Sequence, residues 1–344
     1  MPKPFNLLAE FANFGAERRL SLRDEELKEA FGLHVSSSVE QALADDILLH
    51  GQRAEAMFEA LVVALGEHKL IKSEDGGRFH STENFRVPDF RVVLRDGEQW
   101  LVEVKNVYEE DPFAQRRLLM KRDYREALEA YAAATGAKLK LAVFWARWSV
   151  WTLVSPERFI DPSGNLLLGM NAAMIGNELG RLGDRTIGTR APLRLRFTSD
   201  PARTSTIDED GQVTVTFGGW QLLSGEDVVT EPVEKEIAFI FMEHGEWRCD
   251  GPLAIVEGNR LEAVEFRWEP EEPTDQGFEF VGSLSRMFAR YFASETLKDK
   301  SVVQLRAPLR PAWFAPLIQT DPVSDALPLW RFLMQPRYPS PAPV

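Results

Sequence analysis

The chain has very little cysteine and lacks long hydrophobic runs. Cys249 is the single cysteine among 344 residues, which excludes an internal disulfide and a zinc site built from several thiolates. The sequence contains no run of about 18 apolar residues, the length that a membrane-spanning helix needs. The N-terminal segment lacks the basic, apolar and small-residue regions of a secretion signal. These absences predict a cytoplasmic protein without a membrane partner.

Several common enzyme signatures are also missing. The sequence has no G-x-x-x-x-G-K-[ST], no G-x-G-x-x-G and no G-x-S-x-G, which argues against a P-loop ATPase, a dinucleotide enzyme and a serine hydrolase. Its five histidines are scattered without metal-ligand spacing.

Negative charge is concentrated in one region. The net charge is −13, but residues 206–280 hold 19 acidic and only 4 basic residues, while the remainder holds 34 acidic and 36 basic residues. The acidic region is therefore a poor surface for phosphate, and the rest of the chain is free to carry basic surfaces.

The first half reads as a helical region followed by an α/β domain. We expect helices over residues 1–48, with Ser21 as one N-cap and Ser37 with Glu40 as a capping box. The domain predicted over residues 49–160 contains these elements: an amphipathic helix at 51–66 (Met57, Leu61 and Leu65 with Phe58 and Val62), a strand at 69–72, a hairpin at 85–107, a helix at 112–135 ended by Gly136, and strands at 139–145 and 148–154. This order predicts a mixed sheet flanked by helices.

The second half reads as a β-rich α+β domain over residues 165–330. A helix near 169–182 precedes a set of alternating runs, PLRLRF, QVTVTF, KEIAFIFM, LAIVE and EAVEFRW, and a helix near 282–297 follows. The proline-rich tail at 331–344 is expected to be disordered at its end.

The hairpin places two acids opposite each other. Arg95-Asp96-Gly97 fits a three-residue loop with Gly97 at the positive-φ bulge position, so Leu94 pairs with Glu98. This register sets Asp89 opposite Glu103 and gathers one apolar face, made of Phe90, Val92, Leu94, Trp100, Val102 and Val104. A two-residue loop would shift the register by one and mix polar with apolar residues on that face. The first register is favoured.

Two carboxylates about 5 Å apart repel each other, and a divalent cation relieves the repulsion. Mg²⁺ prefers oxygen ligands and is held by one or two carboxylates plus phosphate oxygens. Lys105 lies two residues beyond Glu103 on the same side, where an ammonium can orient water or stabilise developing charge. This combination suits phosphodiester hydrolysis. A solvated hairpin face with a cross-strand ion pair is the alternative.

Pro88-Asp89, followed by Glu103-Val104-Lys105, resembles the PD-(D/E)XK motif of restriction-endonuclease-like nucleases over roughly residues 50–155. The resemblance implies that Asp89, Glu103 and the Val104 carbonyl hold Mg²⁺ or Mn²⁺ and that Lys105 is catalytic. It also implies Glu55 as an auxiliary acid, in a setting similar to G-x-x-x-E, unless Glu55 is an ordinary exposed helix acid. The Q-x-x-x-Y signature of the RecB-like branch is absent.

Two further residue sets have open alternatives. Arg117, Lys121 and Arg125 recur at intervals of four in the helix predicted at 112–135, where they either follow a phosphate backbone or form a solvated face. The tryptophans at 145, 148 and 151 either stack on bases or, more often in such strands, pack in the core.

The predicted function is Mg²⁺-dependent endonucleolytic cleavage of nucleic acid, with DNA as the expected substrate and a role in defence suggested only by the resemblance. The alternatives are a non-catalytic nucleic-acid-binding or assembly protein on the same scaffold, and a structural protein with no nucleic-acid role. The resemblance also implies a homodimer, because symmetric cleavage by this fold usually needs a dimer. The acidic region at 206–280 is expected to associate with itself, bind a protein partner or mimic nucleic acid.

Overall fold

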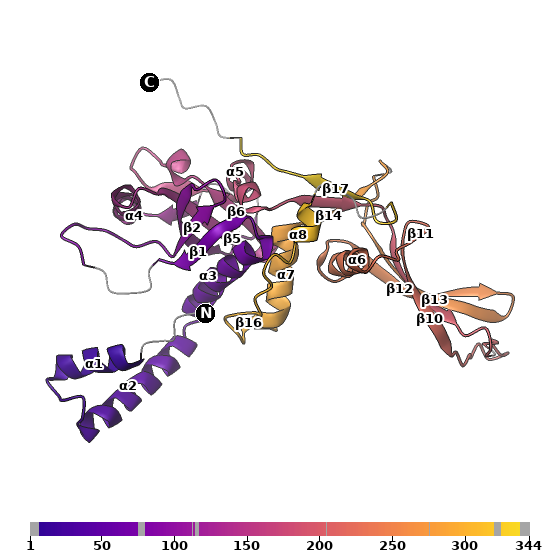
Figure 1. Cartoon of the computed structure of the whole chain (residues 1–344), viewed down its shortest axis with the longest axis horizontal. Helices are drawn as coiled ribbons and strands as arrows, with labels where there is room; N and C mark the ends of the chain where they lie inside the picture. The colour runs from indigo at the N-terminus through magenta and orange to yellow at the C-terminus, as the bar shows by residue number, and fades with distance from the viewer. Residues whose placement is uncertain are drawn as a thin grey trace. The chain divides into compact units, whose positions relative to one another are not determined.

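The computed structural model describes residues 7–74, 80–111, 113, 117–203, 205–274, 276–319 and 325–337 (Figure 1). The chain forms two compact units, residues 1–53 and 54–344. The proline-rich end predicted to be disordered, residues 338–344, lies outside the described residues.

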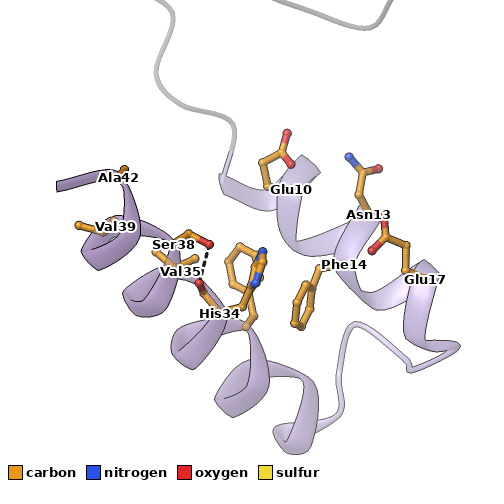
Figure 2. A pocket seen from close by; sticks show the side chains of 10 residues that line it. Glu10, Asn13, Phe14, Glu17, His34, Val35, Ser38, Val39 and Ala42 are labelled. Atoms are coloured by element: carbon orange, nitrogen blue, oxygen red, sulfur yellow. Dashed lines mark hydrogen bonds between the residues drawn. The ribbon is translucent and has the colours of Figure 1, made fainter. Parts of the chain in front are cut away.

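The first unit contains helices α1 (Leu7–Arg18) and α2 (Glu25–Leu43). They pack through aromatic rings, with Phe14 against Phe31 at 5.3 Å between centroids and stacked on His34 at 4.9 Å. Leu27 is fully buried beside them. The two helices border an open groove of about 400 Å³, with Glu10 and Glu17 of α1 on one side and His34, Ser38 and Val39 of α2 on the other (Figure 2).

Both predicted helix caps in this unit were wrong. The residue at the N-cap position of α2 is Asp24, and its carboxylate accepts a hydrogen bond from the Ser21 N–H. Ser37 lies inside α2, because this helix continues through the predicted boundary to Leu43. Neighbouring Ser38 donates its hydroxyl to the His34 carbonyl, four residues earlier, which satisfies the hydroxyl within the helix.

The second unit begins with a mixed five-stranded sheet in the order β1-β2-β3-β5-β6. Its strands are β1 (His68–Ser73), β2 (Phe90–Leu94), β3 (Gln99–Val107), β5 (Lys138–Trp145) and β6 (Val150–Val154). Only the β3–β5 pair is parallel. Helix α3 (Asp46–Leu65) buries the predicted stripe of Met57, Phe58, Leu61, Val62 and Leu65 on one face of the sheet, and α4 (Arg122–Ala134) packs on the other (Figure 1).

The predicted hairpin register is confirmed. Phe90 pairs with Val102 and Val92 with Trp100, while the Leu94 N–H donates to the Glu98 carbonyl at 2.9 Å. Gly97 has φ +91°, the left-handed conformation that its loop position requires. All six residues of the predicted apolar face are buried in one core. The opposite face is also covered, by α4, which the sequence pattern of the hairpin alone did not indicate.

The helix predicted at 112–135 was too long. Residues Arg117–Met120 form a strand, β4, that pairs antiparallel with β7 (Leu166–Leu168), and α4 begins only at Arg122. A pairing partner almost fifty residues away overrides the local helical pattern. The predicted end of the helix is confirmed, because Gly136 has φ +67° and the Ala137 N–H closes back on the Ala132 carbonyl.

The remainder of the second unit is rich in β-strands. A five-stranded antiparallel sheet has the order β11-β10-β9-β13-β12, and a three-stranded sheet has the order β14-β8-β17. The elements are η1 (Ala146–Trp148), η2 (Pro156–Phe159), α5 (Met170–Ile175), η3 (Leu179–Leu182), β8 (Thr186–Thr189), β9 (Leu193–Ser199), β10 (Phe217–Ser224), β11 (Asp227–Val228), α6 (Pro232–His244), β12 (Arg248–Glu257), β13 (Arg260–Glu269), β14 (Glu279–Ser283), α7 (Leu284–Thr296), β15 (Leu297–Lys298), β16 (Ser301–Val302), α8 (Ala315–Ile318) and β17 (Leu329–Phe332).

Three predictions in this part need correction. KEIAFIFM belongs to helix α6, where Pro232 occupies the first turn and the buried residues Ile237, Phe241 and His244 recur at helical spacing. In QVTVTF only Phe217 is in a strand, at the start of β10. The helix predicted near 169–182 is shorter, because α5 ends at Ile175 and a 3₁₀ turn follows.

One hydrophobic core spans the predicted boundary near residues 160–165. It joins α3 and the apolar face of the hairpin to α7, which contributes Met287, Phe288 and Phe292. A buried polar network crosses the same boundary. The Lys140 ammonium donates to Ser155 at 2.6 Å and to Glu178 at 2.7 Å. The five-stranded mixed sheet therefore shares its core with the β-rich part.

Candidate functional site

Asp89 lies just before β2, at the point where the hairpin opens. Its Oδ2 accepts a hydrogen bond from the Val104 N–H of β3 at 2.7 Å, and its backbone carbonyl accepts one from the Glu74 N–H at 2.8 Å. Pro88 before it is buried, which helps fix the entry into the strand. Asp89 is therefore held from two sides, one residue before the Phe90–Val102 pair that follows the predicted register.

Glu103 and Lys105 meet on the face of β3 that α4 covers. Glu103 is only 3% exposed. Its Oε1 accepts two hydrogen bonds, from Lys105 Nζ at 2.6 Å and from the Tyr124 hydroxyl at 2.5 Å. Lys105 keeps 28% of its side chain exposed. One carboxylate oxygen is thus fixed by a strand lysine and a helix tyrosine, and the ammonium still reaches solvent.

Each carboxylate keeps one oxygen without a hydrogen-bond donor. Within the described ranges, no donor reaches Oδ1 of Asp89 or Oε2 of Glu103. Carboxylate oxygens without protein donors are the atoms that a hard divalent cation takes as ligands. The hydrogen bonds to the other two oxygens set the orientation of both groups.

The surroundings of Asp89 disfavour its ionised form, so a nearby positive charge would stabilise the carboxylate. Burial and the negative charge of Glu103 raise the pKa of Asp89 from 3.8 to about 8, against the opposing effect of the Val104 N–H. The charge of Glu55 adds to this rise, and Lys105 reduces it. Glu55 on α3 therefore acts on the same carboxylate from another element. With a pKa of about 8, the Asp89 carboxyl is mostly protonated at neutral pH unless a cation lies beside it.

The two donors to Glu103 are both kept protonated. Burial alone would lower the pKa of Lys105, but the charge and hydrogen bond of Glu103 raise it above its ordinary value. Burial and the Glu103 carboxylate raise the pKa of Tyr124 to about 12. At neutral pH, Lys105 is therefore a cation and Tyr124 remains a hydrogen-bond donor.

A second polar cluster supports the site from the next strand. Glu74 accepts hydrogen bonds from Arg91 at 2.7 Å and from the Tyr131 hydroxyl at 2.9 Å, and it also pairs with Lys72. Against the effect of burial, these partners lower the pKa of Glu74 to about 2. The cluster connects the end of β1, strand β2 and α4, and the Glu74 N–H fixes the Asp89 backbone.

The predicted basic row was wrong as geometry. Arg117 lies on β4 and donates to the Tyr108 carbonyl, and Lys121 is the N-cap residue of α4. Arg125 is buried, donates to the Gly164 carbonyl and pairs with Glu129. These three residues do not share one helical face, because the helix begins after the first two. Arg125 is occupied inside the protein.

The tryptophans divide between two environments. Trp145 and Trp151 are almost fully buried, which fits the core-packing alternative. Trp148 is partly exposed, and its indole N–H donates to the Glu109 carbonyl.

Two residues at the site were missed from the sequence. They are Tyr124 and Arg86. Tyr124 lies on the same face of α4 as Leu128 and Tyr131, but its hydroxyl reaches Glu103. A tyrosine in an apolar stripe that packs over an acid-bearing strand is the signal that could have found it.

The donor set fits a cation that retains water. Within the described residues, no group of three or more His, Cys, Asp or Glu side chains could hold a metal ion. Mg²⁺ commonly uses only one or two carboxylates and completes its octahedron with water and substrate oxygens. Asp89 Oδ1 and Glu103 Oε2 meet this smaller requirement.

No family model matches the chain, and no curated protein matches it. Among the solved structures that match is Hjc, a Holliday junction resolvase from the archaeal hyperthermophile Archaeoglobus fulgidus. It has 20% identity over 32% of this chain and 81% of that chain, with a TM-score of 0.25. Similarity this weak carries no argument about fold or activity. No helix in the described part of the chain is long and apolar enough to cross a membrane.

Proposed function

We propose that this chain is a restriction-endonuclease-like nuclease that hydrolyses phosphodiester bonds, with DNA as its main substrate. The observation that carries the proposal is the pair of carboxylate oxygens without donors, Asp89 Oδ1 and Glu103 Oε2, beside a charged lysine that is partly exposed. A structural ion pair has no need for a second, half-buried acid whose pKa is raised to about 8.

In this proposal Asp89 and Glu103, with the Val104 carbonyl, hold Mg²⁺ or Mn²⁺. The bound ion would supply charge neutralisation and a coordinated water of lowered pKa. Glu103 is held by Lys105 and Tyr124, and Asp89 by the Val104 N–H, so both acids are oriented before substrate binds. This preorganisation avoids rearrangement during the reaction.

Lys105 has the second role. Because its ammonium is charged and partly exposed, it can place one N–H on Glu103 and another on the attacking water or on a phosphoryl oxygen. Glu55 acts as an auxiliary acid, since its negative charge already influences Asp89. The acidic region at 206–280 is given no contact with the nucleic acid, because its charge repels phosphate.

Cleavage assays test this proposal. Supercoiled plasmid, linear duplex, single-stranded DNA and RNA are incubated with purified protein in Mg²⁺, Mn²⁺ or EDTA. We expect cleavage of DNA that requires the cation and is lost in Asp89→Ala and Lys105→Ala. Asp123→Ala, an exposed acid on α4, serves as the control and should retain activity.

Cleavage that survives both site variants would contradict the assignment. Cation-independent binding without cleavage would instead favour a non-catalytic nucleic-acid-binding protein.

The homodimer and a protein partner for residues 206–280 remain predictions. Light scattering of the purified chain tests the homodimer, and affinity capture with charge-reversed controls tests the protein partner. Deletion of residues 165–344 does not test these roles, because it would remove part of the hydrophobic core that the mixed sheet shares with the β-rich part.

A further inference from the structure

Arg86 is fixed beside the site by the segment that leads into the hairpin. Its backbone N–H donates to the Ala127 carbonyl of α4 at 3.1 Å, and the neighbouring Phe85 ring packs edge-on against Tyr131 with 6.2 Å between centroids. The Arg86 guanidinium lies 4.5 Å from the centre of the Tyr124 ring. Backbone and side chain are therefore both positioned against one face of α4.

The Arg86 side chain is exposed, and among the residues that the structure describes no carboxylate forms an ion pair with it. Other arginines near the sheet differ, since Arg91 pairs with Glu74, Arg95 with Glu67 and Arg125 with Glu129. Arg86 is thus an exposed cation that the Tyr124 ring holds in place.

Tyr124 connects this cation to the carboxylates. Its hydroxyl donates to Glu103, its ring lies under Arg86, and Lys105 Nζ is 5.1 Å from the centre of the same ring. One side chain therefore contacts the acid, the lysine and the arginine. Arg86 also precedes Asp89 by only three residues, a span of about 10 Å at most.

We propose that Arg86 binds a phosphate group of the nucleic-acid substrate next to the bond that is cleaved, and that Tyr124 is a positioning residue for both Glu103 and Arg86. The inference rests on the proposed nuclease function and extends it to substrate binding. A guanidinium presents a planar fork of donors that matches phosphate, and an aromatic ring below it restricts its orientation. The acids of the site repel a polyanion, and Arg86 supplies the compensating attraction.

The test separates binding from chemistry. In a Lys105→Met background, which is expected not to cleave, fluorescence anisotropy measures the affinity for a labelled DNA duplex over a range of salt concentrations. We expect Arg86→Ala to weaken binding roughly 5- to 20-fold and to reduce the log–log salt slope by about 1. Arg86→Lys should keep the salt slope and recover only part of the affinity. Arg203→Ala, an exposed arginine preceding the acidic region, is the matched control and should change neither.

Steady-state cleavage then gives two different signatures. With Arg86→Ala we expect a raised KM and a retained kcat, whereas Tyr124→Phe, which keeps the ring and removes the hydroxyl, should lower kcat and leave KM nearly unchanged. An Arg86→Ala affinity and salt slope equal to those of the Arg203→Ala control would overturn the inference. If the wild type binds DNA but never cleaves it, and Arg86→Ala still weakens binding, the phosphate contact stands and the nuclease assignment fails.

Discussion

Replacing Asp89 by Asn should make the metal-free protein more stable at high pH. Burial and Glu103 raise the pKa of Asp89 from 3.8 to about 8 in the folded state. Protonation of Asp89 therefore stabilises the folded state. This contribution to the free energy of unfolding is fully present below the unfolded pKa of 3.8 and is lost as pH rises through the folded pKa of about 8. At pH 9 the wild type carries a half-buried negative charge at position 89 that destabilises the fold, and the Asp89→Asn variant does not.

The size of the effect follows from the shift. Between pH 5 and the folded pKa of about 8 lie about three pH units, which at 1.36 kcal/mol each give an upper bound of roughly 4 kcal/mol. Asp89 is only partly buried and its charge is screened by water, so we expect about 2 kcal/mol. The amide oxygen of Asn can still accept the Val104 N–H, so the hairpin contact is kept.

Urea denaturation followed by circular dichroism, in EDTA at pH 5 and pH 9, measures the difference. Asp89→Asn should gain about 2 kcal/mol on the wild type between the two pH values, with the exposed Asp123→Asn as a flat control. An equal difference at both pH values would refute the electrostatic account of the site. With Mg²⁺ present, the wild type should be stabilised and Asp89→Asn should not.

Three further predictions use other parts of the structure. Lys140→Met should cost about 3–5 kcal/mol in urea denaturation, because it leaves Glu178 buried without its cation, and adding Glu178→Leu should restore most of that loss. Glu98→Gln should cost about 1 kcal/mol at pH 7; the pKa of Glu98 is lowered to about 2, so its stabilisation is present above pH 4.5 and the deficit should shrink by pH 3. Glu55→Gln should slow cleavage roughly 10- to 100-fold with unchanged DNA affinity.

The hairpin and its register could be predicted because two local rules agree. The Gly97 loop fixes the pairing, and the alternation of apolar residues excludes a shift of one residue. Asp89, Glu103 and Lys105 follow directly from that register. The stripe of α3 could be predicted for the same reason, since its period is long and regular.

The secondary-structure predictions were wrong where contacts between distant residues determine the structure. β4 forms because Arg117–Met120 pairs with β7, and the local sequence pattern does not indicate this pairing. KEIAFIFM contains two isoleucines and two phenylalanines, which favour strands, yet it packs as helix α6 against the shared core. The hydroxyl of Tyr124 and the guanidinium of Arg86 gain their roles only when α4 lies over β3.

The most direct test of the central claim is to locate the cation. Crystals of the protein soaked in Mn²⁺ would give an anomalous signal at each bound ion. We predict one ion within about 2.5 Å of both Asp89 Oδ1 and Glu103 Oε2, and its loss in Asp89→Asn. A saturating soak that leaves this position without signal, while the protein still cleaves DNA, would contradict it.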